Sequence, residues 1–167
     1  MLKGALLSVI LLSCAGVGRV LSNARRRRVE LLGELLAAMR VLRLRMLNSM
    51  EPLGILMRKS DSRLFRELGN SLWEGGGLRE CWNEMRKAQM RRGSMLDSLT
   101  GEDLELLDCF FQNLGQSGRE EQCALFATVI ARMEEEQSAA RRRYADASKV
   151  YTALGTLIGI AICVLIV

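Results

Sequence analysis

The sequence of 167 residues contains no histidine. Histidine is the most frequent general base in enzymes and a usual zinc ligand, so its absence argues against a Ser-His-Asp triad and the common zinc centres. A phosphate-binding GxxxxGK[ST] loop is also missing, and the glycines at 75–77 are not followed by residues that would complete one. We therefore expect a protein that is not an enzyme and that holds neither a cofactor nor a metal ion.

Proline and aromatic residues are scarce. Pro52 is the only proline, and aromatic residues make up 5% of a chain that is 49% hydrophobic. The core must therefore be built mainly from Leu, Met and Ala, which favour helices, whereas β-branched residues are sparse before the C-terminal segment. We expect an all-α protein with a compact bundle of about six helices.

Charged residues are absent from two segments, one near each end. Residues 4–18 and 150–167 contain none, and arginine runs lie just inside both segments. Short cytoplasmic loops of membrane proteins are enriched in Lys and Arg, and both runs face the middle of the chain. The pattern predicts an N-terminal transmembrane helix at 1–22, a cytoplasmic helical bundle at 23–149 and a C-terminal transmembrane helix at 150–167. The arginines that would set this topology are Arg25, Arg26, Arg27, Arg28, Arg141, Arg142 and Arg143.

The C-terminal apolar segment has about 18 residues, which is enough for a thin membrane span at a rise of 1.5 Å per residue. Gly155 and Gly159 within it form a GxxxG pattern, which allows a second helix to approach closely. One interpretation is a packing face for another membrane helix. The other is that the pattern reflects only the general frequency of glycine in membrane helices.

The N-terminal segment allows a second interpretation. Lys3, a short apolar run and small residues resemble a signal peptide, and the residues from Leu11 to Cys14 resemble a bacterial lipobox. Under that alternative, Cys14 carries a lipid and the chain is an exported lipoprotein that binds an envelope component. Four consecutive arginines after the apolar run would impede export, and a snorkelling Arg19 lets the span extend further. The sequence therefore favours a span over a lipoprotein signal.

The net charge of +5 and the pI of about 9.2 also occur in nucleic-acid-binding proteins. The basic clusters lie beside the apolar ends, however, where topology and anionic lipid account for them. No aromatic residues alternate with the arginines to stack bases. Membrane lipid is therefore the expected partner of these clusters, and nucleic acid is not.

Apolar residues recur at helical spacing from Val29 to Met50, which predicts a long helix that ends before Pro52. Further helices are expected near 53–56, 64–73, 78–89, 100–115 and from 117 onward. Thr100 and Ser117 each precede an acidic residue by three positions, so both are expected to cap a helix. Cys81, Cys109 and Cys123, the cysteines between the apolar ends, are expected to be free thiols, because their number is odd and no CxxC pair occurs.

Several short motifs occur in order along nearly the whole chain. They are Met1-Leu2-Lys3-Gly4 before the apolar run, Met50-Glu51-Pro52-Leu53, Trp82, Phe111-Gln112-Asn113-Leu114-Gly115 followed by Gln122, and the stretch from Tyr151 to Gly159. In order and spacing they resemble the stage III sporulation protein AB family of endospore-forming bacteria, which has a "TPL" helix stop, a tryptophan and an "LG…Q" stretch. The combination with two apolar ends makes the resemblance specific.

This resemblance implies a membrane platform protein, with a cytoplasmic bundle similar to the F-protein domains of type II secretion and type IV pilus machines. Its expected partners are a stage III sporulation AA-type ATPase and other stage III sporulation membrane proteins. The complex of this family is expected to form a channel or feeding apparatus across the two membranes around the forespore. The chain would then lie in the mother-cell-derived membrane, with its domain facing the cytoplasm.

One departure from the family concerns the first long helix. The family often has two glutamates there in an "LExEI" pattern, whereas this chain has Arg43 and Arg45. If those acids dock a basic partner surface, the partner or the contact surface must differ here. Glu30, Glu34 and Glu51 are the acidic residues left on or beside the helix. A docking role is one hypothesis for them, and a solvated helix face is the simpler one.

Overall fold

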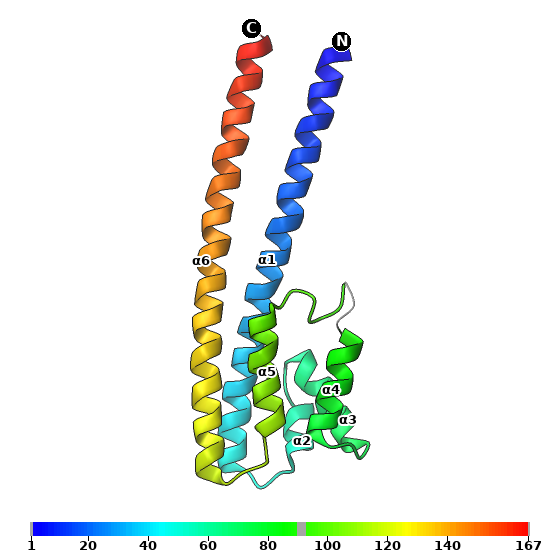
Figure 1. The fold of residues 1–167 in the computed structure, drawn as a ribbon, viewed down its shortest axis with the longest axis vertical. Helices are drawn as coiled ribbons and strands as arrows, with labels where there is room; N and C mark the ends of the chain where they lie inside the picture. Colours follow the sequence, from blue (N-terminus) through cyan, green and yellow to red (C-terminus); the bar gives the residue numbers. More distant parts are fainter. Residues whose placement is uncertain (1, 90–92, 167) are drawn as a thin grey trace. The chain divides into compact units, whose positions relative to one another are not determined.

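The computed structural model describes the backbone of residues 2–89 and 93–166, and the side chains of residues 25–89 and 93–146. Over the described backbone it contains six helices and no strand (Figure 1). The helices are α1 (Leu2–Asn48), α2 (Leu53–Arg58), α3 (Arg63–Trp73), α4 (Leu78–Gln89), α5 (Gly101–Asn113) and α6 (Arg119–Ile166). The prediction of an all-α helical bundle is confirmed.

The chain divides into two compact units. Glu30–Ser138 forms one, and Met1–Val29 together with Ala139–Val167 forms the other, so the helices α1 and α6 contribute to both. The predicted transmembrane helices 1–22 and 150–167 lie outside the residues whose side chains are described. Among residues 25–89 and 93–146, no helix carries an apolar stretch long enough to cross a membrane. The two spans and the domain boundaries stay predictions.

A cluster of aromatic rings forms the centre of the unit Glu30–Ser138. All four phenylalanines of the chain belong to it, together with Trp82. Phe111 of α5 lies 4.6 Å from Trp82 of α4 and 5.5 Å from Phe65 of α3, measured between ring centroids. Phe110, also on α5, lies 5.1 Å from Phe126 of α6. Four helices therefore meet at one buried cluster, which concentrates the few aromatic residues where they fill the most space.

The first long helix, α1, buries one stripe of apolar side chains. Leu32, Leu35, Met39 and Leu42 are at most 3% exposed, as their helical spacing predicted. The predicted stripe also included Met50, and this part was wrong, because α1 ends at Asn48 and the Met50 side chain is fully exposed. Helical periodicity applies only while the chain remains helical.

The two predicted helix caps have different outcomes. Thr100 forms a capping box at the start of α5: its Oγ1 accepts from the Asp103 N–H at 3.4 Å, and its own N–H donates to the Asp103 carboxylate at 2.9 Å. Ser117 does not cap α6, because that helix begins two residues later. The Ser117 hydroxyl instead accepts from the side-chain amide of Gln122 at 2.8 Å. The carbonyl oxygen of the same Gln122 side chain accepts from the Gly115 N–H at 3.0 Å. Gln122 therefore holds the α5–α6 loop.

Cys81, Cys109 and Cys123 are free thiols, as predicted. Cys81 is buried in α4, whereas Cys109 is exposed on α5. Burial raises the pKa of the Cys81 thiol, and the nearby carboxylates of Glu84 and Glu80 raise it further, because all of these disfavour the thiolate.

We expect iodoacetamide to modify Cys81 roughly tenfold or more slowly than Cys109, since the thiolate is the nucleophile and Cys81 is both shielded and harder to deprotonate. The measurement is timed alkylation of the full chain in mild detergent, followed by peptide mass spectrometry. Denaturant serves as the control and should bring the two rates close together. Equal rates in the folded chain would contradict the burial of Cys81.

Candidate docking surface

The three acidic residues predicted to dock a partner do not form one surface. Glu30 and Glu34 are exposed one turn apart on α1, whereas Glu51 lies in the loop that follows this helix. The rise of 1.5 Å per residue places the end of α1 roughly 27 Å from Glu30. The structure therefore brings Glu30 and Glu34 together and leaves Glu51 apart from them.

Glu34 already has a role within the fold. Its Oε1 accepts a hydrogen bond at 3.0 Å from the backbone N–H of Arg63, the first residue of α3. The N-cap residue of α3, Ser62, contributes no side-chain cap of its own. A carboxylate from another helix therefore satisfies a free N–H at the positive end of α3. Glu34 joins α1 to α3, so a partner would have to compete with this contact.

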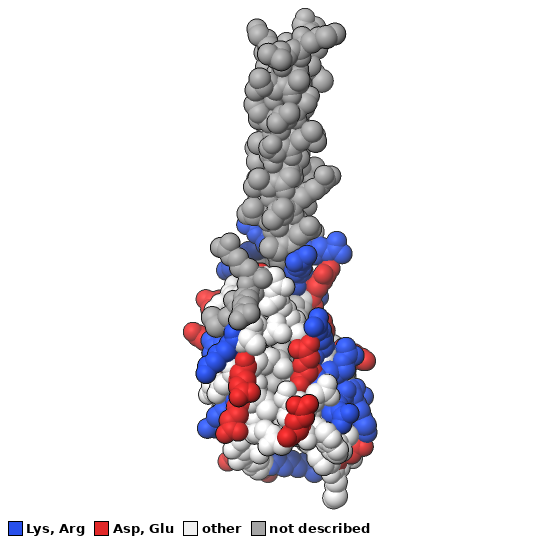
Figure 2. Space-filling view, turned by 90° about the vertical axis from the view of Figure 1, so that its right-hand side faces the viewer, with Lys and Arg blue, Asp and Glu red and all other residues white. Residues whose placement is uncertain are grey.

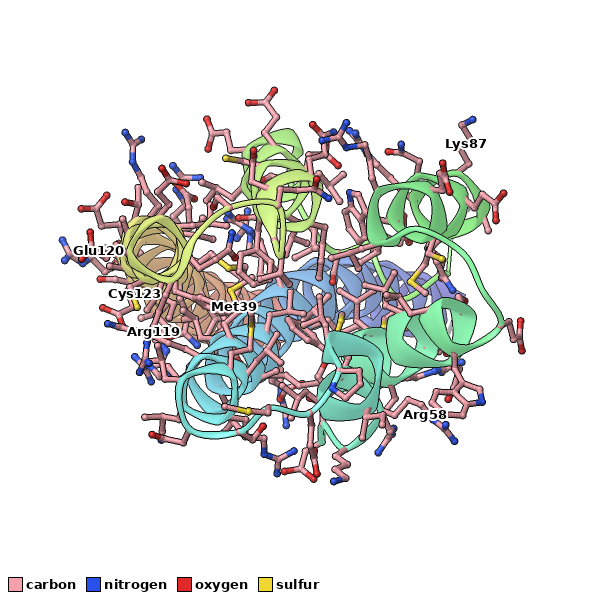
Figure 3. All side chains as sticks on the ribbon, turned by 90° about the horizontal axis from the view of Figure 1, so that it is seen from below. Met39, Arg58, Lys87, Arg119, Glu120 and Cys123 are labelled. Carbon is pink, nitrogen blue, oxygen red and sulfur yellow. The ribbon has the colours of Figure 1, made fainter. Side chains whose placement is uncertain are left out.

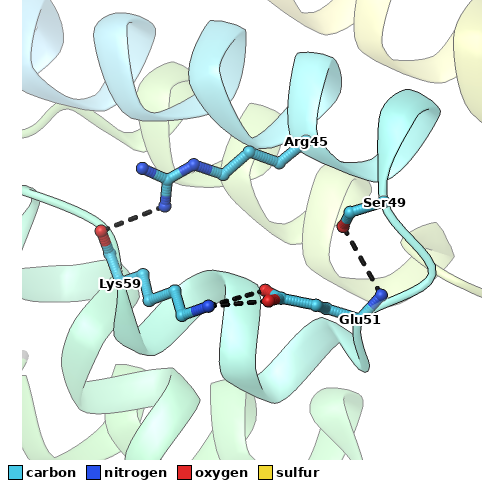
Figure 4. A network of polar contacts seen from close by, with 4 residues as sticks. All are labelled: Arg45, Ser49, Glu51 and Lys59. Carbon is cyan, nitrogen blue, oxygen red and sulfur yellow. Dashed lines mark hydrogen bonds and ion pairs between the residues drawn. The ribbon is translucent and has the colours of Figure 1, made fainter.

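Glu51 takes part in a network that joins the end of α1 to α2 (Figure 4). The Lys59 ammonium donates to both oxygens of the Glu51 carboxylate, at 2.7 and 2.9 Å. A guanidinium nitrogen of Arg45 donates to the Lys59 carbonyl oxygen at 3.1 Å, and the Glu51 N–H donates to Ser49 Oγ at 3.4 Å. Lys59 is the C-cap of α2, where a cation complements the negative end of the helix. Arg45 therefore has a structural role.

Arg43 has no such role, although it is only two residues away. Its side chain is half-buried, and its guanidinium makes no hydrogen bond or ion pair with any residue whose side chain the structure describes. Of these two arginines, Arg45 is used inside the fold, whereas the Arg43 guanidinium has donors that no described residue uses.

The start of α6 is joined to the end of α1 by Arg119. A guanidinium nitrogen of Arg119 donates to the Leu47 carbonyl oxygen at 3.2 Å. No local sequence pattern predicts this role of Arg119, because none shows that two helices so far apart along the chain lie side by side. A second contact between them is the ion pair of Arg40 with Glu134 at 2.5 Å. Glu134 is the first of three consecutive glutamates, and it thus serves a contact between helices.

The surface carries charges of both signs. On the face drawn in Figure 2, acidic and basic side chains both spread over the described part, with uncharged residues between them. Among the side chains at 25–89 and 93–146, no group of Cys, Asp and Glu is arranged to hold a metal ion. A single continuous charged patch does not dominate this face, so a docking surface must be sought in local features.

The arginines predicted to set the topology are mostly solvent-accessible. Arg25, Arg26, Arg27, Arg141, Arg142 and Arg143 are exposed, whereas Arg28 is 8% exposed. Exposed guanidinium groups are suited to anionic lipid. Their role in topology stays a prediction.

Gly155 and Gly159 belong to α6. They lie outside the residues whose side chains the structure describes. The proposed packing face for another membrane helix therefore stays a prediction as well.

One known protein family matches nearly the whole chain. The sequence model of stage III sporulation protein AB matches residues 3–167. The chain belongs to the stage III sporulation protein AB family. The resemblance inferred from the sequence motifs is thereby confirmed. No curated protein and no solved structure gives a significant match.

Two of the family motifs have visible functions in the fold. Trp82 lies in the aromatic cluster, and Gln122 holds the loop between α5 and α6 through its contacts with Gly115 and Ser117. These motif residues of the stage III sporulation protein AB family therefore serve packing and loop geometry in this chain.

Proposed function

We propose that the chain is a non-enzymatic membrane platform component of a secretion-like channel between the mother cell and the forespore. Its helical unit Glu30–Ser138 would engage a secretion-type ATPase in the cytoplasm. Membership of the stage III sporulation protein AB family over residues 3–167 carries this proposal. The absence of histidine and of a phosphate-binding loop agrees with a role in binding rather than catalysis.

The two long helices support this proposal. Helix α1 has 47 residues and α6 has 48, and each connects an apolar end of the chain to the unit Glu30–Ser138 through a continuous helical backbone. Arginines just inside both apolar ends favour a cytoplasmic position for the segment between them. A platform built in this way would link an ATPase to membrane subunits through two helices.

The proposal is tested by the side of the membrane on which the unit lies. The loop at residues 75–77 is exposed, and Gly75 has a positive φ of 104° that marks a turn, so a fluorescent protein that folds only in the cytosol is best inserted there. We expect fluorescence in the membrane fraction and copurification of the AA-type ATPase with the full chain.

The opposite result has an equally definite meaning. An intact fusion that does not fluoresce and is digested by external protease would overturn the platform proposal. It would favour the exported lipoprotein anchored at Cys14. A Cys14→Ser variant would then be expected to lose its membrane attachment, whereas a platform held by two spans should keep it.

A further inference from the structure

A pocket of about 270 Å³ lies between the last turns of α1 and the first turns of α6, beside the α5–α6 loop. We call it the α1–α6 pocket. Met46 and Leu47 of α1 and Phe126 of α6 supply its apolar surface. A dry cavity of about 150 Å³ is enough to hold benzene, so this pocket has room for a leucine or phenylalanine side chain.

The charged residues that line the pocket have one sign. Arg43 and Arg119 both line it, and no carboxylate does. Figure 3 shows Arg119 and Cys123 on the side of α6 that faces α1, whereas Glu120 points away from it. The helical spacing agrees, because Arg119, Cys123 and Phe126 share one face of α6 and Glu120 is turned from it by about 100°.

Both guanidinium groups have unused donors. Arg43 makes no hydrogen bond or ion pair with the described residues, although its side chain is half-buried. Arg119 donates from one guanidinium nitrogen to the Leu47 carbonyl oxygen, and this contact fixes its position. Because an arginine has five N–H donors, others remain for a ligand. Planar guanidinium groups bind carboxylates in a bidentate manner and are more weakly hydrated than ammonium groups. Two of them beside an apolar cavity form a complementary site for an acidic ligand.

The apolar surface continues outside the pocket. Leu44 is 60% exposed and lies three residues before Leu47, so the two side chains are neighbours on α1. Val41, three residues before Leu44, is 42% exposed. A ligand that filled the pocket would therefore meet further apolar side chains along α1, which favours an extended segment of a protein over a small anion.

We propose that the α1–α6 pocket binds a short acidic segment of a partner protein. One apolar side chain of that segment enters the pocket, and carboxylates beside it pair with Arg43 and Arg119. This inference rests on the proposed function in one respect, which is that the AA-type ATPase is the protein that carries the segment.

The test compares two charge reversals that are chemically identical. Arg43→Glu places a negative charge at the pocket, whereas Arg66→Glu makes the same change on α3, at an exposed residue that does not line the pocket. We expect Arg43→Glu to weaken binding of the full chain to the ATPase roughly tenfold or more, and Arg66→Glu to leave it nearly unchanged. Leu44→Ser should also weaken binding, without affecting the fold, because Leu44 is exposed.

A photo-crosslinking residue at position 44 identifies the segment itself. In sporulating cells, we expect crosslinks to a stretch that is rich in Asp or Glu and contains an apolar residue, and we expect Arg43→Glu but not Arg66→Glu to abolish them. Reversal of the crosslinked carboxylates to lysine should then restore binding to the Arg43→Glu variant.

The results separate this inference from the proposed function. If the wild-type chain binds the ATPase and Arg43→Glu binds it equally well, the pocket proposal is overturned and the platform proposal stands. If the wild-type chain does not bind the ATPase, the platform proposal loses its expected partner. The crosslinks in cells then test the pocket proposal by themselves. Crosslinks to a second copy of the chain, to lipid alone or to a segment without carboxylates would overturn the pocket proposal.

Discussion

Replacing Trp82 with alanine is expected to lower the free energy of unfolding by about 3–5 kcal/mol. Trp82 is completely buried and packs on Phe111 with a centroid distance of 4.6 Å, so its removal leaves a large cavity beside the aromatic cluster. Its ring N–H also donates to Asp108 at 2.7 Å. Asp108 forms an ion pair with Arg86, and its carboxylate would lose one of these two donors.

The chain contains its own control for this substitution. Trp73, the only other tryptophan, is 64% exposed, and Arg58 lies over its ring at 5.3 Å. An exposed cation–π contact contributes about 0.5–1 kcal/mol, so Trp73→Ala should have a small effect. Trp82→Phe separates the packing from the hydrogen bond, since it keeps an aromatic ring and loses the donor.

The measurement is chemical denaturation of the full chain in mild detergent, followed by far-ultraviolet circular dichroism. Each tryptophan variant also leaves one tryptophan as a fluorescent probe. If Trp82→Ala costs no more than Trp73→Ala, the aromatic cluster is not the core of the unit Glu30–Ser138.

The secondary structure could be predicted from the sequence, because the patterns that indicate it are local. The spacing of Leu32, Leu35 and Met39 on one helix face, and the capping box of Thr100 and Asp103, depend only on near neighbours. Ser117 matches the same local pattern, but the prediction that it caps α6 was wrong. Its hydroxyl is used by the side chain of Gln122, one turn into α6, and the helix begins at Arg119 instead.

The candidate docking surface was harder to predict from the sequence, because it depends on tertiary contacts. Glu34 and Glu51 were predicted as docking candidates by their charge, yet the fold gives each an internal partner, the Arg63 N–H and the Lys59 ammonium. Arg43 was noticed only as a departure from a family pattern. The pocket beside it exists because the first turns of α6 pack against the end of α1, and no sequence pattern specifies that pairing.

The second large effect is expected at Gly69, where an alanine should destabilise the chain by about 2 kcal/mol. A Cβ atom at Gly69 of α3 would lie 2.6 Å from the backbone nitrogen of Arg58 and 2.9 Å from the carbonyl oxygen of Gly54. Both are backbone atoms, so no side-chain rotation relieves the contact, and α2 must move away from α3. Overpacking of this kind costs about 1–3 kcal/mol or more. It outweighs the gain of up to about 1 kcal/mol from replacing glycine in a helix.

Gly101→Ala is the matched control for this clash. A Cβ atom at Gly101, the first residue of α5, meets no atom within 4 Å, so the same substitution should be neutral or slightly stabilising there. Denaturation midpoints of the two variants measure the difference directly. If Gly69→Ala were as stable as Gly101→Ala, the close approach of α2 and α3 would be wrong. The position of Lys59 at the C-terminal end of α2, on which the contacts with Arg45 and Glu51 depend, would then need revision.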